Sequence, residues 1–152
     1  MFTREVLGIK EVQVAVEAIL EEASKDPGQP VSVAIVDDHG EVICAARMDG
    51  AVPMYNYMAF KKARSSATTG KNTRAWFDFL GKRNYTAHDF VPDATRIPGG
   101  IAVVKPNGES SGDARPGDNV VYGGIGVSGR SGNEDEALSI IGLEALQKAV
   151  WG

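Results

Sequence analysis

The sequence predicts an α+β domain in which a central antiparallel sheet is flanked by N-terminal, middle and C-terminal helices. Two apolar runs of β type flank a short Asp/Gly turn, which indicates a β-hairpin. The order helix, hairpin, two helices, two strands, helix is typical of an antiparallel sheet and not of alternating βαβ units. The chain has 152 residues without a repeat or linker, so we expect residues 1–152 to form one domain.

Composition and charge exclude several classes of protein. Hydrophobic residues make up 43% of the chain and charged residues 24%, close to the average for globular proteins. The formal net charge is −4, and Lys61, Lys62 and Arg64 form the only tight basic group. Nucleic acid is therefore not an expected partner.

The chain is expected to be cytoplasmic and to have no membrane partner. Lys10, Glu11 and Glu17 interrupt the first apolar segment, which therefore lacks the continuous run of a signal peptide or membrane span. The single cysteine, Cys44, excludes an internal disulfide and a multi-cysteine metal site. Because it lies in an apolar run, we expect Cys44 to be buried.

The first elements are a helix and a hairpin. Thr3 is the candidate N-cap of an amphipathic helix that ends before residues 26–28, and its apolar stripe contains Val12, Val16, Ile19, Leu20 and Ala23. Strands are predicted over residues 31–36 and 41–46. Both are apolar on two faces, which predicts that both lie in the middle of the sheet.

Two helices follow the hairpin. Pro53 opens the first, and Gly70 ends it. Most residues of the inward stripe of this helix are small. The full stripe is Tyr55, Met58, Ala59, Lys62, Ala63, Ser66 and Ala67. Asn72 or Thr73 is expected to cap a short helix that ends at Gly81.

The remaining chain contains a long loop, two strands and a helix. Residues 82–100 have no sustained hydrophobic period, and a loop of this length in a compact domain is usually functional, so a site is expected there first. Strands over 101–105 and 120–127 are separated by a polar loop from Pro106 to Val120 that carries charged residues. The last helix places these residues on one stripe: Leu138, Ile141, Gly142, Ala145, Leu146 and Ala149.

The glycine-rich stretch 124–129 matches the dinucleotide fingerprint GxGxxG, but its context argues against that function. The fingerprint requires a βαβ unit with an acidic residue on the next strand, whereas here the chain ends in a helix. That helix begins with Glu134, Asp135 and Glu136, which would repel a phosphate. The glycines are better explained by close approach of the backbone to a neighbour or a ligand.

The two histidines occupy different environments. His39 lies in the hairpin turn and is expected at the surface. His88 lies in the 82–100 segment beside Tyr85, Asp89 and Arg96. It could serve as an axial iron ligand or a general base, and the alternative is an exposed loop histidine.

Three further charged residues are candidates for a site. Arg47 and Asp49 share a strand face at the end of the hairpin, where they either line a cleft or form a surface ion pair. Lys62 lies on the inward stripe of its helix, so it should either extend to solvent or meet an anion in a pocket. We expect the 82–100 loop to fold back over the strand end and to bring Arg47, Asp49 and His88 into one site.

Several separated blocks of the chain, in order and between residues 5 and 150, together resemble the GlcG/HbpS family. The blocks are Val33-Ala34-Ile35-Val36-Asp37 with Gly40, the stretch 46–51, Lys62-Ala63 with Ala67 and Thr73, Pro98-Gly99-Gly100, and the stretch 124–129 with Asp135 and Glu136. The resemblance implies a profilin-like fold, assembly into dimers or larger homo-oligomers, and heme binding in some members. Some relatives are heme-degrading, others are encoded beside enzymes of small-molecule catabolism, and a similar domain ends the PduO-type cobalamin adenosyltransferases.

Two functions are compatible with this resemblance. The first is a homo-oligomeric heme-binding protein, for which the resemblance also allows heme degradation. In this protein His88 is the metal ligand and Arg47 or Lys62 contacts the propionates. Thr73 and the apolar residues Met48, Met54, Met58, Trp76 and Phe77 would complete its pocket. The second is a cofactor-free enzyme of small carboxylate or aromatic catabolism. In that enzyme Arg47 or Lys62 holds an anionic substrate, His88 or Asp49 moves a proton, and the backbone of Pro98, Gly99 and Gly100 stabilises an oxyanion.

Overall fold

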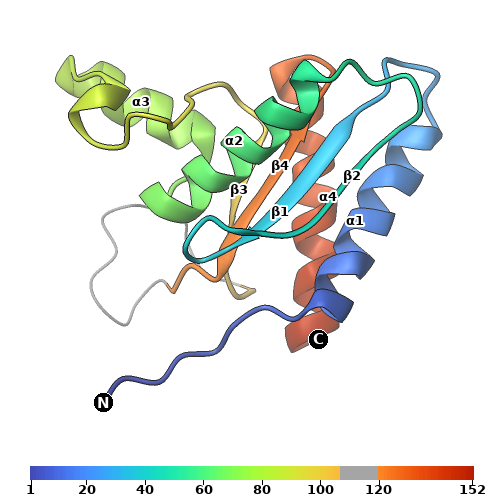
Figure 1. Cartoon of the computed structure of the whole chain (residues 1–152), viewed down its shortest axis with the longest axis horizontal. Helices are drawn as coiled ribbons and strands as arrows, with labels where there is room; N and C mark the ends of the chain where they lie inside the picture. The colour runs from blue at the N-terminus through green and yellow to red at the C-terminus, as the bar shows by residue number, and fades with distance from the viewer. Residues whose placement is uncertain (107–119) are drawn as a thin grey trace.

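The computed structural model describes residues 1–106 and 120–152 and confirms the predicted α+β class (Figure 1). Apart from its two ends, the predicted loop from Pro106 to Val120 lies outside the described residues. The elements are α1 Ile9–Ser24, β1 Ser32–Asp37, β2 Val42–Arg47, α2 Met54–Thr69, α3 Thr73–Arg83, a short 3-10 helix η1 Ala87–Asp89, β3 Gly100–Val103, β4 Gly123–Ser128 and α4 Gly132–Trp151.

The four strands form an antiparallel sheet in the order β2-β1-β4-β3. Strand β1 lies in the middle of the sheet, as predicted, but β2 lies at its edge, so the prediction for the second hairpin strand is wrong. The apolar residues Ile43, Cys44 and Ala46 of β2 pack on one face only, and Cys44 is half-buried. The other face of β2, which carries Val42 and Ala45, is largely exposed. Two-sided apolarity therefore did not distinguish an edge strand from a central one.

Helices α1 and α4 lie side by side against one face of the sheet (Figure 1). Their apolar stripes meet the large side chains of β1 and β4 in the main core. Fully buried members of this core include Val12, Ile19, Val33, Ile35, Ile125, Val127 and Leu146. Burial of these apolar side chains stabilises the fold through the hydrophobic effect.

Helix α2 covers the opposite face of the sheet at unusually short range. A Cβ atom on Gly124 or Gly126 of β4 would lie well inside contact distance of the carbonyl oxygens of Ala63 and Ala59. The backbone of α2 therefore rests on the backbone of β4, which only glycine on one side and small residues on the other permit. Close approach to a helix, and not to a nucleotide, explains the glycine-rich stretch.

Several predicted element boundaries are wrong for identifiable reasons. Helix α1 begins after Gly8 and not after Thr3. The side chain of Asn72, the N-cap residue of α3, accepts a hydrogen bond from the Ala102 backbone N–H at 2.9 Å and makes no cap bond. Helix α3 continues past Gly81 to Arg83, because Asn84 adopts the left-handed conformation (φ 53°) that ends it.

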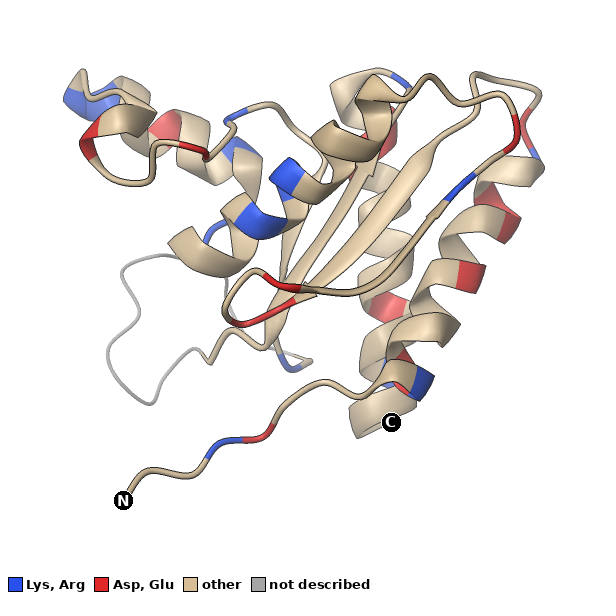
Figure 2. Cartoon of the chain, in the orientation of Figure 1, with Lys and Arg blue, Asp and Glu red and all other residues tan. Residues whose placement is uncertain are grey.

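Charged residues of both signs are interspersed along the described chain (Figure 2). The one tight basic group of the sequence is dispersed by the fold. Lys62 is buried and Arg64 pairs with Asp93 at 3.2 Å, which leaves Lys61 as the exposed cation of the three. No helix in residues 1–106 or 120–152 combines the length and hydrophobicity that crossing a bilayer requires.

Candidate functional site

Lys62 occupies an internal position between α2, β4 and α4. Its side chain is only 2% exposed, and Nζ donates hydrogen bonds of 2.9 Å to the Val127 carbonyl oxygen and to Oδ2 of Asp135. Oδ1 of Asp135 accepts a bond of 3.0 Å from the Arg130 backbone N–H. The sequence suggested that Lys62 either extends to solvent or meets an anion in a pocket; it does meet an anion, but this is the internal carboxylate of Asp135 and not a ligand. Lys62 holds three elements together.

The space for this ion pair depends on Gly99. Its φ of +127° is rarely adopted by other residues, and a Cβ there would lie 2.8 Å from Nζ of Lys62. Burial raises the pKa of Asp135, and the ammonium of Lys62 opposes that shift. The pair is a structural feature whose charges are kept together away from water.

The other predicted ligand-binding residues near this pair also serve the fold. The Gly100 backbone N–H donates to Oγ1 of buried Thr73 at 3.0 Å. The Gly99 carbonyl accepts bonds from Ser139 Oγ at 2.6 Å and from the Val127 N–H at 3.2 Å. Pro98 packs beside the first turn of α4. The backbone that was expected to stabilise an oxyanion is thus engaged inside the protein.

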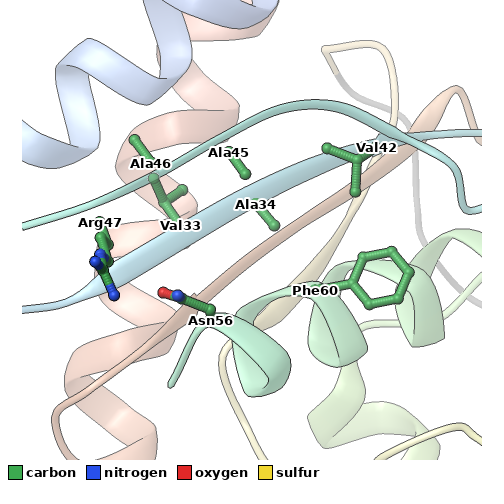
Figure 3. A pocket seen from close by; sticks show the side chains of 8 residues that line it. All are labelled: Val33, Ala34, Val42, Ala45, Ala46, Arg47, Asn56 and Phe60. Atoms are coloured by element: carbon green, nitrogen blue, oxygen red, sulfur yellow. The ribbon is translucent and has the colours of Figure 1, made fainter. Parts of the chain in front are cut away.

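A first surface hollow, which we call the outer-strand hollow, lies between α2 and the exposed face of β2 (Figure 3). It has a volume of about 380 Å³. Arg47 lies at one end of it, whereas Asp49 is exposed beyond the strand and does not line it. The lining residues are Val33, Ala34, Val42, Ala45, Ala46, Arg47, Asn56 and Phe60.

A second hollow of about 340 Å³, the loop hollow, lies between α2 and the segment that follows α3. Its lining residues are Lys61, Thr86, Ala87, Ala94, Thr95, Arg96 and Ile97. The exposed residue His88 is next in the chain to Ala87. A capping box formed by Thr86 and Asp89 holds the short helix η1 on which His88 stands.

Aromatic side chains gather beside η1. Trp76 stacks on Phe79 with ring centroids 5.4 Å apart, and Phe90 packs edge-on against both rings and against Tyr85. Tyr85 and Phe90 remain about half exposed. Arg96 lies over the ring of Phe77, with the guanidinium carbon 5.3 Å from its centroid. This surface combines apolar area with cations.

The structure does not bring Arg47, Asp49 and His88 together. The end of β2 and the segment carrying η1 lie at opposite sides of the molecule (Figure 1). The 82–100 segment packs along α2 and α3 instead of folding over the strand end, because the Thr95 N–H is bonded to Ser65 Oγ at 2.7 Å. A proton-transfer site built from these three residues is therefore not assembled.

The predicted methionines are also dispersed. The sulfur of Met48 accepts a bond of 3.4 Å from the Val31 N–H and packs at the margin of the main core. Met58 is half-buried on α2 and Met54 is exposed at its start, and neither lines the two hollows described here. No group of three His, Cys, Asp or Glu side chains within residues 1–106 and 120–152 is arranged to hold a metal ion.

Sequence reasoning missed the α2 residues that line the hollows: Asn56, Phe60 and Lys61. A signal was present, since Asn56 and Phe60 are four residues apart and lie off the inward stripe of their helix. Polar and aromatic residues at that spacing predict a second helix face, but not what that face borders.

Comparison with known proteins places this fold in a family. The family model described as "Haem degrading protein HbpS-like" matches residues 7–144, so the chain belongs to the HbpS-like family. Protein GlcG of Escherichia coli (strain K12) is 29% identical over 128 residues, which span 84% of this chain and 85% of that protein.

Solved structures agree with this assignment. A double mutant of HbpS from Streptomyces reticuli is 27% identical, with a TM-score of 0.78 over 96% of this chain and 90% of that chain. The PduOC–heme complex has a TM-score of 0.74 over 93% of this chain and 95% of that chain. At 21% identity it supports the fold alone.

Proposed function

We propose that this protein binds heme at the surface formed by α3, η1 and the loop hollow, with His88 as the axial ligand. The observation that carries the proposal is the available imidazole of His88. The ring makes no hydrogen bond or ion pair with any residue that the structure describes, whereas Nε2 of His39 accepts a bond of 2.9 Å from Arg4 Nη1. Membership of the HbpS-like family supports heme as the group that His88 would hold.

The surroundings of His88 fit the other parts of heme. Half-exposed Tyr85, Phe90 and Phe77 offer aromatic area for the porphyrin ring. Lys61 and Arg96 line the adjacent hollow and can pair with the propionates. When bound, heme supplies an iron whose chemistry is set by its axial ligand and by access to the open side. Lys62, which pairs with Asp135, is not part of this site.

Titration with hemin tests the proposal directly. We expect a sharp Soret band that saturates at one heme per chain, because an imidazole ligand and an aromatic surface together define one site. The measurement is visible absorption at fixed protein concentration. A spectrum that remains that of free hemin at all ratios would exclude this function.

We also propose that the chain assembles into homo-oligomers through the outer edge of β2. The outward N–H groups of Gly100 and Ala102 on the other edge strand, β3, are bonded to Thr73 and Asn72 side chains. No described side chain is seen to cover β2 in this way. An uncovered edge strand is a ready template for pairing with a second copy.

Light scattering checks the assembly. We expect a mass of at least twice the 16.1 kDa of the chain at micromolar concentration. A Val42→Pro variant, which places a residue without an N–H on the edge strand, should shift the mass toward the monomer. A wild-type protein that is monomeric throughout would refute the assembly without affecting the heme proposal.

A further inference from the structure

We infer that the outer-strand hollow binds a small organic carboxylate with an apolar or aromatic body. The inference does not depend on the heme proposal, because the two hollows share no lining residue. The outer-strand hollow also contains no His, Met, Cys or Tyr side chain that could ligate iron. Its volume of about 380 Å³ falls in the range of small-molecule sites.

The floor of the hollow exists because α2 does not cover β2. Ala34 of β1 and Ala45 of β2 are partners across the sheet, and both have short side chains (Figure 3). Phe60 of α2 and Val42 of β2 stand at one end of this floor. Val42 is 49% exposed although it is apolar. This end suits the apolar part of a ligand, whose binding would remove these side chains from water.

The opposite end of the hollow is polar. Arg47 from β2 and Asn56 from α2 point toward each other there (Figure 3). The guanidinium of Arg47 makes no hydrogen bond or ion pair within the described chain. Oδ1 of Asn56 accepts a bond of 2.6 Å from Ser32 Oγ, which fixes the amide and leaves its nitrogen as a donor. One unpaired guanidinium and one fixed amide donor therefore face the same space.

The combination of an apolar end and a polar end in one hollow indicates the class of ligand. A guanidinium binds a carboxylate through two parallel hydrogen bonds, and the amide of Asn56 can donate a third. The lining contains no second cation, which disfavours a doubly charged phosphate, and no carboxylate, which disfavours an amine. An arylacetic or similar acid would place its charge at Arg47 and its ring toward Phe60.

Protein-observed NMR with phenylacetate tests the site. We expect amide shifts at Ala45, Asn56 and Phe60 that saturate, and at least about tenfold weaker binding of the neutral analogue 2-phenylacetamide. Arg47→Met should weaken phenylacetate binding by a similar factor. Asn56→Asp should also weaken it, because it keeps the acceptor for Ser32 and replaces the donor with a negative charge.

Controls separate this site from the heme site and from general charge effects. Lys82→Met removes the same charge from the exposed end of α3 and should leave phenylacetate binding unchanged, as should His88→Ala. Hemin binding should persist in Arg47→Met. Equal binding of acid and amide, or unchanged affinity in Arg47→Met, would overturn the inference. The inference would also be overturned if phenylacetate caused no shifts at the lining residues of the wild-type protein and the Val42→Lys variant lost self-association. The hollow would then be an interface between copies.

Discussion

Replacing Lys62 with Met is expected to lower the free energy of unfolding by about 3–5 kcal/mol. The variant keeps the length of the side chain but leaves the carboxylate of Asp135, which is 2% exposed, without its cation. It also removes a donor from the Val127 carbonyl. Because domains are stable by only about 5–15 kcal/mol, this is a large share of the total. Urea denaturation at pH 7.5 measures the loss.

The pH dependence identifies the buried carboxylate as the cause. Burial already raises the pKa of Asp135, and removing Lys62 raises it further, so the folded variant retains a proton that the unfolded chain releases above about pH 4. The variant therefore loses stability as the pH rises toward the folded pKa. We expect the difference from wild type to be smaller at pH 5 than at pH 7.5.

A second change completes the test. Adding Asp135→Asn to Lys62→Met removes the unpaired charge and keeps an acceptor for the Arg130 N–H, so most of the lost stability should return. A single variant as stable as wild type, or a loss that does not depend on pH, would show that the ion pair does not support the fold.

Replacing Gly126 with Ala is expected to cost at least about 3 kcal/mol, at the upper end of the range for overpacked cores. The added Cβ would overlap the Ala59 carbonyl oxygen and would lie 2.6 Å from the Ala63 backbone nitrogen. Both obstacles are backbone atoms of α2, so relief requires the whole helix to move away from β4. Thermal or urea unfolding measures the cost.

Gly81→Ala is the matched control. Gly81 lies within α3, and no atom lies within 4 Å of the position that its Cβ would take. Alanine has the higher helix propensity, so this variant should be as stable as wild type or more stable by up to about 1 kcal/mol. Equal effects at Gly81 and Gly126 would contradict the close packing of α2 on β4.

The helices and the sheet class could be predicted from local patterns. The periodicity of α2 indicated its inward stripe, and Ala59, Ala63 and Ala67 of that stripe are buried as expected. Periodicity is a property of neighbouring residues, so it survives without tertiary information. The order of the strands cannot be predicted in this way. Both hairpin strands are apolar, and only the placement of α2 decides which of them is covered.

Which residues come together in a site depends on contacts between residues that are distant in the sequence. Lys62 meets Asp135, 73 positions away, and the sequence pattern alone did not pair them. His88 lies away from Arg47 because hydrogen bonds such as that from the Thr95 N–H to Ser65 hold the 82–100 segment against α2. Residue type identified these groups as chemically capable, while the fold determined which of them share a surface.

The most direct test of the proposed function is a hemin titration of wild type, His88→Ala and His39→Ala, followed by the Soret band. We predict the same band and a stoichiometry of one heme per chain for wild type and His39→Ala. For His88→Ala we predict a shifted band and at least about tenfold weaker binding, since the axial ligand is lost. A His88→Ala protein whose band and affinity equal those of wild type would contradict the assignment of His88 as the heme ligand.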